Sequence, residues 1–235
     1  MSDTHLEVRD LRSSYRRNEA IHGISLDVRG GEVVALLGHN GAGKSTTLHC
    51  IAGLQPVSHG SIRLDGDDIT HHGAAASVKI GIGLVLEQAF VFGDLTVREN
   101  LELAGVRVGK EDLERTRAQM LERYPVLSDR GAQRAEALSG GEQRMLSMAM
   151  ALLSSPRLLI LDEPSLGVAP FLVERMMDDI REIATTTGVA VLLVEQNVTQ
   201  ALRVADRAYV MRAGAIIEEQ EAASLAKRER LWELF

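Results

Sequence analysis

Three short apolar runs stand out in the pattern of hydrophobic and polar positions, at residues 33–37, 158–161 and 189–194. Each run is continuous rather than alternating, which is typical of parallel β-strands buried on both faces. Each is followed by glycine or by charged and amide side chains. Because ligands of α/β folds collect at the carboxyl ends of parallel strands, the pattern predicts one binding site where the three runs end.

The other segments carry two different patterns. Between residues 5 and 28, and again at 61–66, short apolar stretches alternate with polar residues, as in antiparallel strands with one exposed face. From about 96 to 155 the apolar positions follow helical spacing instead. The predicted fold class is therefore α/β, with an N-terminal antiparallel β region and an inserted α-helical lobe.

A phosphate-binding loop follows the first apolar run. The segment from Gly38 to Ser45 has the spacing G-x-x-x-x-G-K-[ST] of a P-loop, in the strand-to-helix context that this motif requires. Glycines let backbone N–H groups converge on anionic oxygens, and the next helix points its positive dipole end at them. We expect Lys44 to reach the β- and γ-phosphates and Ser45 to bind Mg²⁺. The predicted nucleotide contacts here are Gly38, His39, Asn40, Gly41, Ala42, Gly43, Lys44, Ser45 and Thr46.

The second apolar run ends in two acids, Asp162 and Glu163. A carboxylate in this place can hold Mg²⁺, and a neighbouring carboxylate off the metal can activate the water that attacks a γ-phosphate. We therefore predict Asp162 as a metal ligand and Glu163 as the general base. The alternative, that the two acids merely end a strand in a turn, is disfavoured by the P-loop in the same chain.

A second candidate anion site begins at Ser139, followed by Gly140 and Gly141. Ser139 and Glu142 have the spacing of a capping box, so an ordinary helix start is the simpler interpretation. The Ser139 hydroxyl can accept an amide hydrogen bond at the cap and still donate its own proton outward. With two glycines beside it, this helix start is suited to a phosphate.

Composition narrows the class of protein. The 235 residues include 26 basic and 33 acidic side chains, for a formal charge of −7, which lacks the basic footprint that nucleic-acid binding requires. The single cysteine, Cys50, excludes an internal disulfide and fits a reducing, cytoplasmic setting. The longest apolar runs fall short of the roughly 20 residues that cross a membrane. We expect no nucleic-acid partner and no membrane-spanning segment.

In this order and spacing, the three motifs resemble the ATP-binding cassette (ABC) family, whose signature segment is matched here by Leu138 to Gln143. In that family the signature of one subunit caps the nucleotide that the P-loop of a second subunit holds. The resemblance therefore implies ATP and Mg²⁺ as cofactors and a head-to-tail dimer, either a homodimer or a paralogous heterodimer. It implies one domain, 1–235, with a P-loop NTPase core and β region at 1–88 and 156–235 and a helical lobe at 89–155.

The resemblance also suggests roles at single positions. Tyr15 sits where the family places an aromatic ring that stacks on adenine, although it could equally be a half-buried strand residue. Ser139, Gly140 and Gly141 would contact ATP across the dimer interface, which the loop Ser165–Val168 is expected to cross. Such dimers drive membrane permeases, so the resemblance implies permease subunits as partners. It places the chain on the cytoplasmic face of the membrane, held there by the permease.

Two switch positions differ from the commoner family pattern. Glu87, rather than Gln88, aligns with the residue that senses Mg²⁺ and the attacking water, and either can ligate the metal through oxygen. Gln196 stands where most members carry a histidine that contacts the γ-phosphate. Its amide can donate a hydrogen bond but cannot become a cation, so we expect a weaker contact that is nearly independent of pH.

These departures resemble one subgroup, the ATPase subunits of branched-chain amino-acid importers. The segments 163–170, 193–197 and 205–210 carry that likeness, whereas residues 89–92 and the tail around Trp232 match it less well. Two alternatives remain: a nucleotide-binding regulatory subunit with low turnover, and a soluble ABC ATPase of DNA repair or translation. The second is disfavoured by the acidic charge and by the single cassette.

Overall fold

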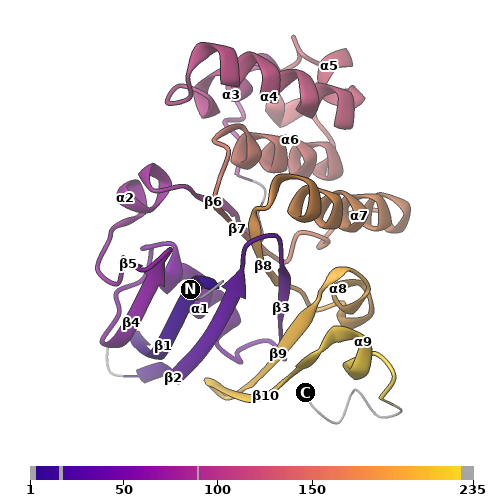
Figure 1. Cartoon of the computed structure of the whole chain (residues 1–235). Helices are drawn as coiled ribbons and strands as arrows, with labels where there is room; N and C mark the ends of the chain where they lie inside the picture. The colour runs from indigo at the N-terminus through magenta and orange to yellow at the C-terminus, as the bar shows by residue number, and fades with distance from the viewer. Residues whose placement is uncertain (1–3, 16–17, 89, 229–235) are drawn as a thin grey trace.

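Two β-sheets organise the computed structural model, which describes residues 4–15, 18–88 and 90–228 (Figure 1). The four-stranded antiparallel sheet has the order β2 (Asn18–Arg29), β1 (Thr4–Tyr15), β4 (His59–Leu64), β5 (Asp67–Asp68). The six-stranded sheet has the order β10 (Ala215–Glu221), β9 (Arg207–Arg212), β3 (Val33–Leu37), β8 (Ala190–Val194), β7 (Leu158–Asp162), β6 (Ile82–Val85). The tail around Trp232 lies outside the described residues.

The three apolar runs form neighbouring strands of the larger sheet, as predicted. β3 pairs in parallel with β8, and β8 pairs in parallel with β7. Every residue of these three strands is buried, because the sheet is covered on both faces. Their carboxyl ends therefore lie at one edge of the sheet, where the predicted chemical groups follow.

The covering of the two faces can be followed in β3. Val33, Ala35 and Leu37 join a core cluster with residues of the helical region, such as Leu146. Val34 and Leu36 point the other way, into a cluster shared with the antiparallel sheet. Alternate residues of one strand thus reach two separate cores, which explains why the run is uniformly apolar.

The helices divide between the two parts of the molecule. The described helices are α1 (Lys44–Ile51), α2 (Ala74–Lys79), α3 (Val97–Ala104), α4 (Lys110–Arg123), α5 (Pro125–Asp129), α6 (Gly140–Leu153), α7 (Pro170–Thr187), α8 (Val198–Val204) and α9 (Ala222–Leu225). A short 3₁₀ turn, Ala135–Ala137, precedes α6. In Figure 1, α3 to α6 gather at the top of the view, beyond the end of the six-stranded sheet. Among the residues described, no helix is both long and apolar enough to cross a membrane.

A buried arginine joins the two sheets. Arg207 of β9 is 8% exposed and forms ion pairs with three carboxylates. Its guanidinium lies 2.6 Å from Glu32, 2.9 Å from Asp27 of β2 and 2.5 Å from Glu219 of β10. The same group donates to the Tyr209 hydroxyl at 3.0 Å. Arg207 therefore holds together acids from three segments where the sheets meet.

Replacing Arg207 with Met is expected to lower the free energy of unfolding by about 3 kcal/mol, because the buried carboxylate of Glu32 and the partly buried one of Asp27 lose their partner. For a chain of this size that corresponds to a fall in Tm of roughly 6–12 °C. The matched control is Arg115→Gln, which removes an ion pair to Asp112 whose side chains are 69% and 57% exposed. The control should cost less than about 0.5 kcal/mol. Equal effects of both variants in thermal and urea unfolding would contradict a structural role for Arg207.

Candidate nucleotide-binding and hydrolysis site

The P-loop connects β3 to α1, and two of its three glycines, Gly38 and Gly43, lie too close to neighbouring strands for a side chain. A Cβ on Gly38 would lie 2.4 Å from the Met211 carbonyl oxygen of β9. Gly43 has φ of 102°, and a Cβ there would lie 2.9 Å from Ile21 of β2. The loop is thus held tightly between two strands, and α1 begins at Lys44 with its free N–H groups directed toward the loop.

Lys44 lies inside this loop, with 4% of the residue exposed. Its Nζ donates to the carbonyl oxygens of Gly38 at 2.6 Å and His39 at 3.1 Å. Burial lowers the pKa of Lys44, and the nearby negative charges of Glu163 and Asp162 oppose that shift. The ammonium therefore lies between the P-loop and two acids, Asp162 at the end of β7 and Glu163 directly after it. This position suits a group that binds phosphate beside a metal.

Asp162 and Ser45 meet between the P-loop and the end of β7. The Ser45 hydroxyl donates to Asp162 Oδ1 at 3.2 Å, and Asp162 is 3% exposed. Burial raises the pKa of Asp162, the hydrogen bond from Ser45 and the nearby His49 lower it, and the charges of Glu163 and Glu87 raise it. A buried carboxylate among like charges is stabilised by a cation, so these oxygens fit Mg²⁺.

Ser45 and Asp162 would supply only part of the coordination shell of Mg²⁺. Within residues 4–15, 18–88 and 90–228, no group of three or more His, Cys, Asp or Glu side chains is arranged to hold a metal ion. Mg²⁺ commonly takes one or two protein ligands and completes its shell with water and substrate phosphates. The pairing of Ser45 with Asp162 suits that mode, and the two residues remain predicted ligands.

Glu163 and Gln196 are joined directly. The Gln196 amide donates to Glu163 Oε2 at 2.7 Å, and the Glu163 N–H donates to the Val194 carbonyl at 2.9 Å. Glu163 is 6% exposed and has a positive φ of 48°, an uncommon backbone conformation for a residue with a side chain. The predicted base and the predicted γ-phosphate switch thus form one hydrogen-bonded pair, in a backbone conformation of the kind found at functional sites.

Glu87 is exposed, and its carboxylate is close enough to Asp162 to raise the pKa of that group. Its backbone is held by Arg144 of α6, whose guanidinium donates to the carbonyls of Leu86, at 2.5 Å, and of Glu87. Arg144 is 4% exposed, and the sequence interpretation missed it. It is the only basic residue between Ser139 and Pro156, a signal that could have singled it out.

Ser139 is the N-cap of α6 and forms the predicted capping box. Its hydroxyl accepts from the Glu142 N–H at 3.4 Å and donates to Glu142 Oε2 at 2.8 Å. The expectation of an outward hydroxyl proton is therefore wrong for this structure, because an ionised carboxylate accepts it. Arg130 lies 3.1 Å from the other Glu142 oxygen. Gly140 and Gly141 begin the helix beside this cap.

Tyr15 ends β1 and is 49% exposed, pairing with Asn18 across the hairpin. About half of the residue is thus accessible, which fits both a stacking platform and a half-buried strand residue. The neighbouring residues 16 and 17 lie outside the described residues. Stacking on adenine stays a prediction.

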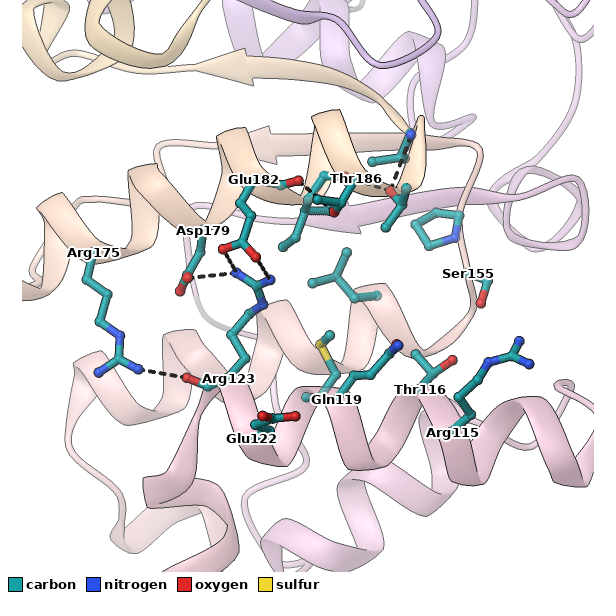
Figure 2. Close-up of a pocket in the computed structure, with 16 residues that line it drawn as sticks. Arg115, Thr116, Gln119, Glu122, Arg123, Ser155, Arg175, Asp179, Glu182 and Thr186 are labelled. Atoms are coloured by element: carbon teal, nitrogen blue, oxygen red, sulfur yellow. Dashed lines mark hydrogen bonds and ion pairs between the residues drawn. The ribbon is translucent and has the colours of Figure 1, made fainter.

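One groove of the described structure lies away from these residues. It measures about 720 Å³ and runs between α4 and α7 (Figure 2). Arg123 of α4 crosses it to reach Asp179 at 2.8 Å and Glu182 at 3.0 Å, and Arg175 donates to the Arg123 carbonyl. None of the predicted site residues lines it. Its ion pairs tie the helical region to α7.

A P-loop at the carboxyl edge of a parallel sheet, with an adjacent acid pair and a metal-binding hydroxyl, defines a nucleoside-triphosphatase. The antiparallel sheet and the helical region with its glycine-flanked cap distinguish it from simpler P-loop folds. The family model described as ABC transporter matches residues 21–166. The chain belongs to the ATP-binding subunits of ABC transporters, and it is an ATPase.

Known relatives and structures agree with that assignment. The high-affinity branched-chain amino acid transport ATP-binding protein BraG of Pseudomonas aeruginosa is 43% identical over 211 residues, which cover 90% of each chain. The lipopolysaccharide export system ATP-binding protein LptB of Haemophilus influenzae is 36% identical over 90% of this chain and 88% of LptB. The cassette MJ1267 in its ADP conformation superposes with a TM-score of 0.86 at 25% identity, covering 99% and 98% of the two chains.

Proposed function

We propose that this chain powers an importer of branched-chain or related amino acids, as one of two cassette subunits that close on two ATP molecules. The proposed dimer is supported by two separate candidate anion sites in one chain. The P-loop lies on the core at the start of α1, whereas Ser139 caps α6 in the helical region. A head-to-tail dimer would bring the P-loop of one subunit to Ser139 of the other, whether the subunits are identical or paralogous.

Each predicted residue then has a chemical role. Tyr15 would stack on adenine, Lys44 would bind the β- and γ-phosphates, and Ser45 with Asp162 would hold Mg²⁺, which would neutralise charge on the phosphate oxygens. Glu87 would ligate the metal through a carboxylate oxygen. Glu163 accepts the proton of the attacking water as general base.

Gln196 gives the site a neutral switch. It donates to Glu163 at 2.7 Å, and the same amide could turn to a γ-phosphate oxygen when nucleotide binds. That exchange would free the Glu163 carboxylate for the attacking water. An amide does not titrate near neutrality, so the switch would respond to phosphate rather than to pH.

The membrane permease would dock on the loop that follows Glu87. Phe90 is 62% exposed and Phe92 is 40% exposed, with ring centroids 5.5 Å apart in an edge-to-face pair. An exposed aromatic pair suits the apolar face of an amphipathic permease helix. Residue 89 lies outside the described residues. This docking would place the chain on the cytoplasmic face of the membrane, where the lobe at 89–155 moves against the core of one domain, 1–235.

The class of transported solute is inferred from the names of two relatives. BraG, named for branched-chain amino acid transport, is 43% identical, and LptB, named for lipopolysaccharide export, is 36% identical. The Glu87 and Gln196 pair, which resembles the importer subgroup, favours the amino-acid reading. Export of a lipid substrate is the second candidate.

Uptake of labelled leucine, isoleucine and valine tests the proposal. Vesicles that contain the chain with its permease should accumulate at least one of these amino acids when ATP is supplied on the cassette side. The same vesicles with Glu163→Gln should accumulate none, because closure without hydrolysis does not complete a cycle. ATP hydrolysis without uptake of any of the three, together with release of lipopolysaccharide to an acceptor, would favour the exporter.

A further inference from the structure

A buried carboxylate with no role in the mechanism above lies beside the hydrolytic pair. Glu195 directly precedes Gln196, at the end of β8, and is 2% exposed. Burying an ionised carboxylate is costly unless hydrogen bonds or opposite charges compensate it. Burial raises the pKa of Glu195, and hydrogen bonds from Ser165 lower it.

Both carboxylate oxygens of Glu195 accept hydrogen bonds from a single residue, Ser165. The Ser165 N–H donates to Oε1 at 2.8 Å, and the Ser165 hydroxyl donates to Oε2 at 2.8 Å. The Asn197 N–H approaches Oε2 at 3.5 Å. This two-point attachment fixes the backbone and the side chain of Ser165 together.

Ser165 begins the loop Ser165–Val168, which separates Glu163 from α7. The loop folds on itself through hydrogen bonds from Leu166 to the Glu163 carbonyl and from Val168 to the Ser165 carbonyl, both at 3.1 Å. Leu166 is 50% exposed at its tip. The apolar tip of the loop lies three residues from the predicted base. A contact of this tip with a second subunit could therefore alter the position of Glu163.

The segments around Glu163 and Glu195 are therefore attached at three levels. The Glu163 N–H binds the Val194 carbonyl at 2.9 Å, and Gln196 binds the Glu163 side chain at 2.7 Å. The Glu195 clamp extends this attachment from the hydrolytic pair to the exposed loop. The base, the switch and the loop are thereby joined into one unit.

We propose that Glu195 is a positioning residue for hydrolysis: by clamping Ser165, it holds the loop Ser165–Val168 in register with the Glu163–Gln196 pair. A partner subunit that presses on the loop then sets the geometry of the base. The inference rests on the proposed dimer, in which this loop meets the second subunit. Glu195 acts through Ser165 and does not touch the nucleotide.

Substitutions at both ends of the clamp test the proposal. Glu195→Ala should lower kcat for ATP roughly tenfold or more, with KM changed less than about threefold, because the base is misplaced but the P-loop is intact. Glu195→Gln should keep kcat within about threefold, since its amide can accept from the Ser165 N–H and donate to the hydroxyl. Ser165→Ala should lower kcat in the wild-type background and have no further effect in the Glu195→Ala background.

The matched control is Glu99 of α3. Its carboxylate also binds the N–H and the hydroxyl of a single residue, Thr96, at 2.7 and 2.8 Å, and this pair caps a helix rather than the hydrolytic loop. Glu99→Ala should leave kcat unchanged. If Glu195→Ala is poorly folded, the isosteric Glu195→Gln and the single Ser165→Ala variant carry the test.

Three outcomes would overturn the clamp: wild-type kcat in Glu195→Ala, additive losses from the two alanine substitutions, or an equal loss in Glu195→Gln, which would assign the effect to charge. Failure of the proposed function has a different signature. In that case Glu163→Gln does not dimerise with ATP. If that dimer forms while the Glu195 variants hydrolyse ATP normally, only the clamp is wrong.

Discussion

Replacing Glu163 with Gln is expected to lower kcat for ATP hydrolysis by a factor of about 10²–10⁴, the usual contribution of a general base. The substitution keeps the size of the side chain, and a glutamine oxygen can still accept the hydrogen bond from Gln196 that Glu163 Oε2 accepts at 2.7 Å. ATP binding should therefore survive, because the P-loop is unchanged. Single-turnover phosphate release and equilibrium binding of ATP measure the two effects separately.

The control for Glu163→Gln is Glu122→Gln, which changes an exposed acid of α4 far along the chain from the P-loop. This control should hydrolyse ATP at the wild-type rate. A Glu163→Gln variant with a rate within about threefold of wild type would remove Glu163 from the role of base.

Replacing Lys44 with Met is expected to weaken ATP binding roughly 30-fold or more, equivalent to about 2 kcal/mol, since hydrogen bonds to charged groups contribute about that much. Lys44 is 4% exposed and is the only lysine or arginine between Gly38 and Ser45. Hydrolysis should fall further than binding, because negative charge shifts on the phosphate oxygens in the transition state. Titration with a fluorescent ATP analogue measures the affinity.

Lys79→Met is the matched control for Lys44, because Lys79 is an exposed lysine near the end of α2. Its affinity for the analogue should equal that of the wild-type chain. An unchanged affinity in Lys44→Met would show that the P-loop does not hold the phosphates in the expected way.

The sheet and the place of the site could be predicted because they depend on local patterns. A run such as Val33–Leu37 is buried on both sides, and β3 indeed divides its side chains between two cores. The capping box at Ser139 follows from residues three positions apart. These signals need no knowledge of which segments are neighbours in space.

The unpredicted features depend on contacts between distant segments. Arg144 reaches the carbonyl of Leu86, 58 positions away, and Glu195 reaches Ser165, 30 positions away. Arg207 contacts Glu32 across 175 positions. A single sequence shows that such charged residues sit in apolar surroundings, but not which partner compensates them.

The direction of the Ser139 hydroxyl proton, toward Glu142, could not be predicted from the sequence either. The sequence showed that Glu142 could cap the helix, but not that its carboxylate would also take the hydroxyl proton at 2.8 Å. A phosphate arriving from a second subunit must compete with that carboxylate, whose charge Arg130 balances at 3.1 Å. Substitution of Ser139 is therefore the sharpest test of the proposed dimer.

Sedimentation of the Glu163→Gln chain with Mg²⁺ and ATP tests whether two subunits share one nucleotide site. The mass is measured for this chain by itself and for its mixture with the paralogous cassette subunit of its transporter. We expect an ATP-dependent dimer, with twice the 25.6 kDa of one chain if the subunits are identical. Adding Ser139→Ala should abolish it, whereas Thr96→Ala, which removes the same kind of cap from α3, should not. A single-chain mass in both samples, or a dimer unaffected by the loss of Ser139, would show that the P-loop and Ser139 do not meet across a dimer.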